Sequence, residues 1–260
     1  MKKKSKYCVS FIGSGRVATA LAAVFVSKEI KINQIYSLHS ENAGKLAKKT
    51  GAKVVPKIED IEETDFIIIA VKDDRIPEIS KKIKTEKSIV LHTSGTVPLK
   101  SLKHKNSGVF YPLQTITQPE IDFRSIPVLI EGSNQFSENK IKVLAKIISP
   151  KIHRVNSAKR LKIHLAAVLV SNFTNYLYHE AEIILRSQKI PFEILLPLIS
   201  KVTGNLYHSL PAKNQTGPAV RKDQKTIKKH LELLSENKKL QTIYKNISDS
   251  IQKIHSAKKK

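Results

Sequence analysis

The chain has 260 residues, of which 40% are hydrophobic and 26% charged, a balance typical of a globular protein. Its single cysteine, Cys8, excludes a disulfide framework and lies in an apolar run, where an inert buried thiol is expected. No segment approaches the ~20 apolar residues that cross a bilayer, and the stretch Tyr7–Ile12 is too short for a signal-peptide core. We therefore expect a soluble protein of the reducing cytoplasm.

The formal net charge of +24 raises the question of nucleic-acid binding. Of the 46 basic residues, 39 are lysine and seven are arginine, and aromatic residues make up only 6%. Nucleic-acid sites favour arginine clustered with aromatic side chains, whereas these lysines are spread over all the predicted helix surfaces. We expect no specific nucleic-acid partner. A basic nucleic-acid-associated protein remains the alternative that this charge keeps open.

From Tyr7 to about Ser149, short β-branched runs alternate with segments of helical periodicity. Predicted strands are Tyr7–Ile12, Gln34–Leu38, Phe66–Val71, Ser88–His92, Val109–Tyr111 and Val128–Glu131. Predicted helices are Val17–Lys28, Asn42–Lys49, Ile76–Lys84 and Glu138–Ile148. This alternation predicts an α/β fold with a mostly parallel sheet of the Rossmann type. Because Phe66–Val71 has no polar alternation, it is predicted to be a central strand covered on both faces.

After about Lys151 the strand signals stop. The remaining helical segments are His153–Gln188, Phe192–Ser200, Gln224–Asn237 and Ile243–Ile254. We therefore expect two domains: residues 1–150 as a dinucleotide-binding domain, and residues 151–260 as an all-helical domain for substrate binding and dimerisation.

The first predicted strand runs into a glycine-rich turn that opens a helix, with the sequence Gly13-Ser14-Gly15-Arg16-Val17-Ala18. Gly13 permits a tight turn, Gly15 lets the backbone approach a pyrophosphate, and Ala18 allows close packing of helix on strand. The start of the helix offers free N–H groups to phosphates. This strand, turn and helix context predicts a dinucleotide site; a glycine-rich turn in another α/β protein is the alternative.

The end of the second strand indicates which nicotinamide cofactor is bound. NAD enzymes usually carry a carboxylate there, but this chain has Ser37, His39 and Ser40, and no acid before Glu41. Without that carboxylate a 2′-phosphate is not repelled, so we expect NADP, with NAD as the alternative. Ser40 also suits the N-cap of the following helix.

Further candidates follow the next strands, at the sheet edge where ligands bind in such folds. Val71 and Asp73 are assigned to the cofactor, and Asp74 to a helix cap. His92 and Ser94 end the fourth predicted strand, and an exposed histidine there suits a proton donor near neutral pH. A histidine satisfied by the backbone beside a Ser-Gly turn is the alternative.

Tyr111 and Gln114 could point a phenol and an amide at the same edge, or Tyr111 could simply be half-buried beside a proline turn. On the long predicted helix, Ser171, Asn175 and Glu182 each fall within about 20° of His164. Such a polar row on an apolar helix needs partners. We assign His164 and Asn172 to the substrate, and Asn175, His179 and Glu182 to structural roles.

The loop Thr216–Asp223 precedes a predicted helix. Arg221 is one of only seven arginines, and its fork suits a substrate carboxylate or phosphate, with Thr216 beside it. Asp223 is expected to cap the helix that begins at Gln224. We find no metal-ligand spacing, so no metal site is expected.

Seven segments together resemble one family of oxidoreductases. They are Gly13–Leu21, Ala70–Asp74, His92–Gly95, Tyr111–Thr115, His164–Ala167, Ser171–Phe173 and Thr216–Asp223. The family joins a Rossmann-like domain to a helical C-terminal domain of unknown function, and is akin to deazaflavin-dependent NADP oxidoreductases, pyrroline-5-carboxylate reductases and 6-phosphogluconate-dehydrogenase-like enzymes. The resemblance implies an NADP-type fold and a homodimer built on the helical domain, and it implies no settled substrate. Tyr111 stands where we would expect histidine, so an imidazole acid/base is not carried over to that position.

The sequence thus predicts an oxidoreductase (dehydrogenase or reductase) that transfers hydride between NADP(H) and a small carbonyl, hydroxyl or imine substrate. A non-catalytic dinucleotide-binding or regulatory protein is the alternative. We further expect His92 and Arg221, from different domains, to meet at one substrate site.

Overall fold

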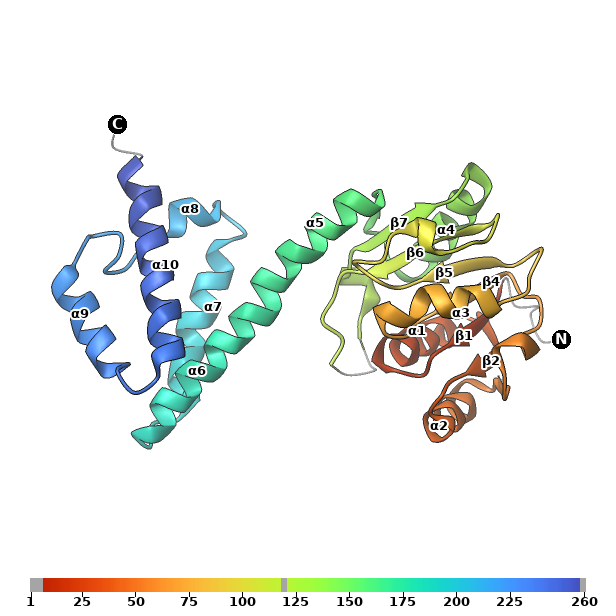
Figure 1. Cartoon of the computed structure of the whole chain (residues 1–260), viewed down its shortest axis with the longest axis horizontal. Coiled ribbons are helices and arrows are strands. Elements are labelled where there is room, and N and C mark those ends of the chain that lie inside the picture. The colour runs from red at the N-terminus through yellow and green to blue at the C-terminus, as the bar shows by residue number, and fades with distance from the viewer. Residues whose placement is uncertain (1–6, 118–120, 258–260) are drawn as a thin grey trace. The chain divides into compact units, whose positions relative to one another are not determined.

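The structure is a computed structural model that describes residues 7–117 and 121–257. Its contacts divide the chain into two compact units, Met1–Asn172 and Phe173–Lys260. The first unit carries the sheet and the second is helical (Figure 1).

The first unit is built on one eight-stranded sheet with the order β3-β2-β1-β4-β5-β6-β7-β8. The neighbouring strands pair in parallel except β6 and β7, which are antiparallel. The strands are β1 (Cys8–Ile12), β2 (Lys31–Tyr36), β3 (Lys53–Val54), β4 (Phe66–Ile69), β5 (Ile89–His92), β6 (Ser107–Pro112), β7 (Val128–Gly132) and β8 (Ile152–Arg154). The order steps outward in both directions from β1 and β4, as in Rossmann sheets. The predicted Rossmann-type fold is confirmed.

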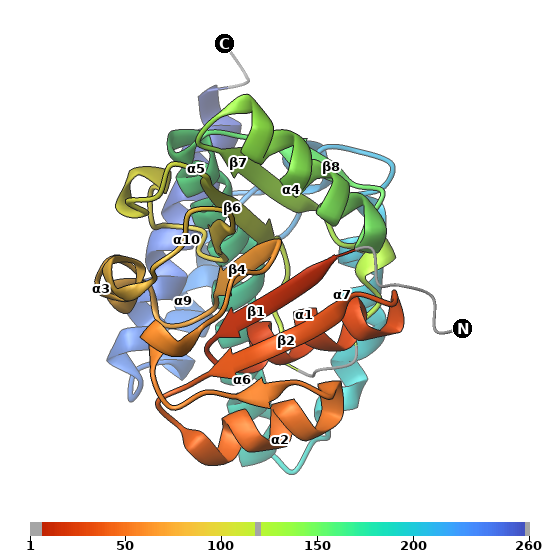
Figure 2. The same cartoon turned by 90° about the vertical axis from the view of Figure 1, so that its right-hand side faces the viewer.

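Helices cover both faces of this sheet. They are α1 (Arg16–Ser27), α2 (Ser40–Thr50), α3 (Ile76–Lys82) and α4 (Gln135–Ile148), with 3₁₀ turns at Ile58–Asp60, Asp73–Arg75, Leu99–Ser101 and Phe123–Ser125. One apolar core lies between the sheet and helices α1, α2 and α4, and a second gathers side chains of α3. Figure 2 shows β1 and β2 adjacent, with α2 alongside β2. All of β4 is buried, which confirms that this run is a central strand covered on both faces.

The helical run that follows the sheet has three parts. Helix α5 (Ser157–Val168) passes into a π-helical turn (Leu169–Phe173) and then into α6 (Thr174–Ser187). The second unit continues with a 3₁₀ turn (Phe192–Leu195), α7 (Leu196–Asn205), α8 (Pro211–Asn214), α9 (Gln224–Leu233) and α10 (Lys238–Ala257). The division after Asn172 falls inside this run. The expected boundary after residue 150, which separates domains by role, stays a prediction.

Two short strands were not expected from the sequence. The prediction that strand signals stop after Lys151 is wrong, because β8 overlaps the start of the predicted helix His153–Gln188 and pairs with β7. Both β3 and β8 are edge strands of two and three residues. An edge strand has one neighbour and needs no continuous apolar run, so the pattern that reveals central strands is absent.

The cap predictions had mixed outcomes. Asp223 caps α9, its carboxylate accepting a hydrogen bond of 3.0 Å from the Thr226 N–H, as predicted. The assignment of Ser40 as an N-cap is wrong because α2 begins at Ser40 and its cap position is His39, which makes no side-chain cap bond. Asp74 lies within a 3₁₀ turn instead of capping α3, whose cap position is Arg75. In both places the helix begins one residue away from the predicted position, a shift that pattern reading does not resolve.

Candidate functional site

The turn after β1 has the backbone that a dinucleotide loop needs. Gly13 has φ +110°, and a Cβ at this position would lie 2.3 Å from the carbonyl oxygen of Ala70. Its N–H donates to the carbonyl of Tyr36 at 2.7 Å, which ties the turn to the end of β2. The Val71 side chain also borders Gly13. Glycine is therefore required at position 13 by both its φ angle and the close approach of the strand β4 end.

Gly15 shows the complementary feature, because a Cβ added there would meet no atom within 4 Å. It occupies the N-cap of α1, which has no side-chain cap and no acidic residue in its first turn. Arg16 and Val17 open the helix with their N–H groups directed out of its N-terminus. Open space beside an uncapped, acid-free helix start fits a pyrophosphate.

The end of β2 lies beside this turn. Ser14 Oγ donates to Ser37 Oγ at 2.8 Å, and the His39 N–H also donates to Ser37 Oγ at 3.3 Å. The nearest acid, Glu41, forms an exposed ion pair with Lys45 at 2.5 Å. Hydroxyl groups and a histidine thus border the place that a ribose would reach, and Glu41, the first acid after β2 in the sequence, is paired with Lys45. This arrangement fits a cofactor with a 2′-phosphate.

His92 is placed differently from the exposed proton donor that we considered. Its side chain is completely buried, and its Nδ1 accepts a hydrogen bond of 3.1 Å from the Ser94 N–H. Burial, together with the charge of Arg160 and against that of Asp73, lowers the pKa of His92 to about 3. The ring is therefore neutral at pH 7. The backbone satisfies only Nδ1, because Nε2 is buried without a hydrogen-bond partner among the described residues. The assignment of His92 as catalytic stays a prediction.

Ser94 supports the turn that follows His92. Its Oγ accepts hydrogen bonds from the Thr96 N–H at 3.0 Å and from the Val97 N–H at 2.9 Å. Thr96 in turn donates from its hydroxyl to the carboxylate of Asp73. The loops after β4 and β5 are joined by this bond, at the sheet edge where the glycine turn also lies.

Tyr111 and His164 form a hydrogen-bonded pair. The Tyr111 hydroxyl lies 3.0 Å from His164 Nδ1, with the rings edge to face. Burial and the charge of Asp73, opposed by Arg160, raise the pKa of Tyr111. The phenol therefore keeps its proton at neutral pH and can donate it to Nδ1 of an imidazole that carries its own proton on Nε2. Position 111 carries tyrosine where we would expect histidine, but His164 of α5 places an imidazole beside it.

Gly95 lets this histidine reach its place. A Cβ at Gly95 would lie 2.5 Å from His164 Nδ1 and 2.7 Å from its Cγ. The imidazole therefore packs directly on the backbone of the loop after β5. Any larger residue at position 95 would have to displace the ring.

A cavity of about 600 Å³ opens beside the pair, within the first unit. The predicted residues Tyr111, Gln114, His164 and Asn172 all line it. Thr115 and Ser171, joined by a hydroxyl hydrogen bond of 2.6 Å, also contribute. Its apolar lining comes from Leu113, Ile163, Ala166, Ala167, Val168 and Val170. This volume suits a small molecule held by a few polar groups.

The start of α5 is fixed to the sheet by a buried ion pair. The Arg160 guanidinium bonds the Glu131 carboxylate and donates to the Val97 carbonyl at 2.5 Å. Glu131 also accepts hydrogen bonds from the N–H and the hydroxyl of Ser157, at 2.9 and 2.8 Å. His164 lies one turn further along the same helix, so this network sets its position.

The sequence did not identify Arg160, Glu131, Thr96 or Gly95. A signal for Arg160 was present, since it is one of the same seven arginines that drew attention to Arg221. Gly95 ends the segment His92–Gly95 and Thr96 follows it, but nothing in the sequence shows which residues face them.

The remaining candidates lie in the second unit. Thr216 and Arg221 are exposed in the loop before α9, and Gly217 between them has φ +106°. His179 and Glu182 form a pair at 3.8 Å, which fits the structural role expected for them. The predicted common face of His164, Ser171, Asn175 and Glu182 assumed a regular α-helix, and the π-helical turn at Leu169–Phe173 interrupts that regularity. The proposed meeting of His92 with Arg221 stays a prediction.

The buried neutral state of His92 predicts a pH dependence of stability. The unfolded chain protonates His92 near its ordinary pKa of 6.5, and the folded chain only near 3. The contribution of the neutral His92 to the free energy of unfolding is therefore fully present above the unfolded pKa, and it is lost as pH falls from 6.5 toward 3. Between about pH 7.5 and pH 5, protonation of His92 in the unfolded chain should lower the free energy of unfolding by up to about 2 kcal/mol. In urea unfolding, His92→Gln should not show this part of the decrease. The exposed His153→Gln should behave as the unmodified chain; an unchanged slope in His92→Gln would contradict the prediction.

Within the described ranges, no helix is long and apolar enough to cross a membrane, and no group of three His, Cys, Asp or Glu could hold a metal ion.

Residues 8–94 match the family described as NADP oxidoreductase, coenzyme F420-dependent. Residues 126–251 match a domain of unknown function, DUF2520.

Several solved structures are similar to the chain. A protein from Bacteroides fragilis, provisionally described as an NADP oxidoreductase, is 33% identical, with a TM-score of 0.90 over 96% of this chain and 99% of that one. An imine reductase from Myxococcus stipitatus in complex with NADP⁺ is 16% identical, with a TM-score of 0.63 over 96% and 93% of the two chains. The 1-pyrroline-5-carboxylate reductase of Streptococcus pyogenes is 17% identical, with a TM-score of 0.63 over 96% and 98%.

The last two similarities concern the fold alone, whereas the first extends over nearly the whole of both sequences. With the glycine turn, the open helix start and the two matched domains, it shows that this chain belongs to the family of NADP oxidoreductases that join a Rossmann-type domain to a C-terminal domain of unknown function.

Proposed function

We propose that the chain is a reductase that transfers hydride from NADPH to the carbonyl or imine carbon of a small substrate, and that Tyr111 and His164 supply the proton. The observation that carries the proposal is the phenol–imidazole pair lining a 600 Å³ cavity in the unit that holds the dinucleotide turn. When bound, the reduced nicotinamide supplies the hydride. The protein must bind and orient both reactants and deliver one proton.

The cofactor would be held by the turn Gly13-Ser14-Gly15 and the start of α1, with Arg16 and Val17 at the pyrophosphate. Ser37, His39 and Ser40 would receive the adenosine ribose and its 2′-phosphate. Val71 and Asp73 border the same sheet edge at the end of β4. The acid-free helix start and the paired state of Glu41 support this assignment.

The proton would come from the imidazole of His164. Its Nδ1 is occupied by the Tyr111 hydroxyl, so Nε2 is the nitrogen free to donate. As hydride adds to the substrate carbon, the substrate oxygen or nitrogen takes the proton from Nε2 while the Tyr111 hydroxyl proton passes to Nδ1, and solvent then restores the proton to the phenol. Tyr111 orients the ring and fixes its tautomer. The backbone-bonded His92 and Ser94 support the adjoining loop in this scheme.

The cavity lining favours a substrate with a small apolar body. Gln114 and Asn172 supply amide groups that could position its polar end. Arg221 would bind a carboxylate or phosphate if the substrate carries one, with Thr216 beside it. Of carbonyl and imine reduction, we favour imine reduction, because two proteins of similar fold are named as an imine reductase and a 1-pyrroline-5-carboxylate reductase.

The cofactor assignment predicts a preference for NADPH over NADH. Ser37→Asp would place a carboxylate where the 2′-phosphate is expected, so it should weaken NADPH binding at least about tenfold through repulsion and affect NADH less. Fluorescence titration of both cofactors measures this. Ser27→Asp, which adds the same charge in the last turn of α1, serves as a control. Equal affinity of the unmodified chain for the two cofactors would contradict the assignment.

The proton-donor pair predicts a loss of turnover with little change in cofactor binding. With 1-pyrroline as the probe, His164→Asn should lower kcat about 100-fold or more, and Tyr111→Phe less, because a general acid contributes ~10²–10⁴. Gly95→Ala should have an effect similar to that of His164→Asn, because the added methyl displaces the imidazole.

The NADPH dissociation constant should stay within about twofold in all three variants, as measured by titration. Tight NADPH binding without turnover of any imine or carbonyl in a broader panel would instead favour a non-catalytic dinucleotide-binding protein.

We also propose that the chain forms a homodimer through its helical unit. That unit buries few apolar side chains, and among its exposed ones Tyr207 is 89% and Leu233 82% accessible. On α7, Leu198 and Val202 lie one turn apart and are both exposed. A surface this apolar is typical of a subunit interface.

The dimer predicts a concentration-dependent mass in sedimentation equilibrium. Leu198→Glu with Val202→Glu should shift the unmodified dimer toward monomer by at least about tenfold in dissociation constant, because charges are poorly tolerated in an interface core. Lys201→Glu, an exposed charge change on the same helix, should leave the dimer intact. A monomeric unmodified chain at assay concentration would overturn the proposal.

A further inference from the structure

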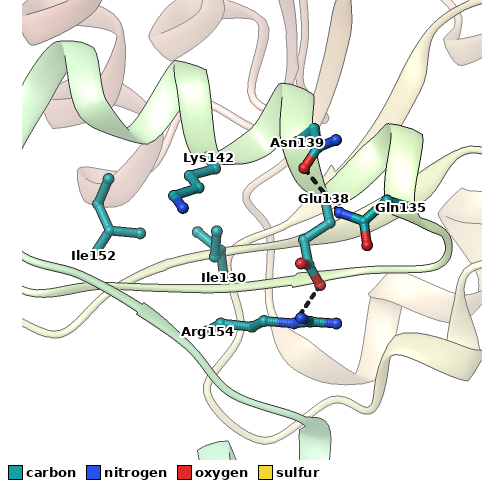
Figure 3. Close-up of a pocket in the computed structure, with 7 residues that line it drawn as sticks. All are labelled: Ile130, Gln135, Glu138, Asn139, Lys142, Ile152 and Arg154. Carbon is teal, nitrogen blue, oxygen red and sulfur yellow. Dashed lines mark hydrogen bonds and ion pairs between the residues drawn. The ribbon is translucent and has the colours of Figure 1, made fainter.

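A second, smaller cavity of about 270 Å³ lies between α4 and the strands β7 and β8, and shares no residue with the cavity beside Tyr111. It is lined by Ile130, Gln135, Glu138, Asn139, Lys142, Ile152 and Arg154 (Figure 3). Two isoleucines and charges of both signs share this small space. Its volume lies below the ~300 Å³ at which pockets for drug-sized ligands begin, so it suits a very small molecule.

Glu138 is held in the cavity by close packing of the helix on the sheet. A Cβ at Gly132, the last residue of β7, would lie 2.6 Å from the Glu138 backbone nitrogen. The Glu138 side chain is only 13% exposed, and its Oε2 pairs with Arg154 Nε at 2.7 Å. Its Oε1 accepts no hydrogen bond from any residue that the structure describes, so one carboxylate oxygen is left to face the cavity.

Lys142 supplies the opposite charge. It follows Glu138 by four residues on α4, an arrangement in which glutamate and lysine often form an ion pair. No such pair forms here, because Glu138 turns to Arg154. The ammonium of Lys142 has no ion-pair or hydrogen-bond partner within residues 7–117 and 121–257. In Figure 3 both side chains point from α4 toward the strand that carries Ile130.

We propose that this cavity binds a small α-amino acid with an apolar side chain. The ligand ammonium would bind Glu138 Oε1, the ligand carboxylate would bind Lys142, and the side chain would pack on Ile130 and Ile152. Gln135 and Asn139, joined by a hydrogen bond of 2.8 Å, border the polar side. One unused carboxylate oxygen and one unpaired ammonium match the two charges of a zwitterion, whereas a simple anion would face Glu138 and a simple amine would face Lys142.

Titration calorimetry of the full chain tests this proposal with L-valine as the probe. Isobutylamine lacks its carboxylate and 3-methylbutanoate lacks its ammonium. We expect one L-valine per chain and binding at least about tenfold weaker for each analogue, since each loses one charged contact. Equal binding of 3-methylbutanoate would show a simple anion site and overturn the proposal, as would no measurable L-valine binding.

Variants locate the binding. Lys142→Met should weaken L-valine binding at least about tenfold, and Lys146→Met, one turn further along α4 and outside the cavity, should leave it unchanged. Glu138→Gln should also weaken it, but this variant loses the Arg154 pair as well. Lys142→Met changes only an exposed, unpaired side chain and therefore keeps the test independent of folding. L-valine binding that survives Lys142→Met would place the amino acid elsewhere and overturn the proposal.

Discussion

The guanidinium of Arg160 is fully buried at the start of α5, and a buried cation costs several kcal/mol unless it is paired and hydrogen-bonded. Glu131 on β7 and the carbonyl of Val97 provide those partners. The N-terminal turn of α5 is therefore held at one loop, after β5, and one strand, β7. Among the described residues the guanidinium Nε has no hydrogen-bond partner, so the burial of this cation is only partly compensated.

The proposed site depends on this attachment. His164 is carried by α5, while Tyr111 ends β6 and Gly95 follows β5, so three separate segments meet at one imidazole. The Tyr111 hydroxyl can hold the His164 ring only if α5 has the correct position along its axis and the correct rotation about it. Gly95 adds a second constraint, because its missing side chain is the space that the imidazole fills. The ion pair of Arg160 with Glu131 fixes the position of α5, and the missing side chain of Gly95 leaves the space for the His164 ring.

The π-helical turn after α5 has a related effect. It places Ser171 where its hydroxyl bonds Thr115, and it brings Asn172 to the cavity wall. π-turns are rare and occur often at functional sites, since they change which residues face a pocket. The division of the chain into two compact units falls within this turn, after Asn172.

The sequence by itself determined the Rossmann-type sheet, the glycine turn and the central strand β4. Each rests on a local rule: φ at Gly13, the apolar run of β4 and the alternation of strands with helices. Tyr111 and Gln114 are candidates because they lie at the ligand edge of the sheet, and His164 and Asn172 because polar groups on an apolar helix need partners.

Only the tertiary structure decided which partners they have. Three features depend on contacts between residues far apart in the chain. They are the edge strand β8, the burial of His92 and the contact of Gly95 with His164. Periodicity reports which face of an element is apolar, and it carries no information about what that face meets. The pairing of Tyr111 with His164, and of Arg160 with Glu131, is therefore set by packing.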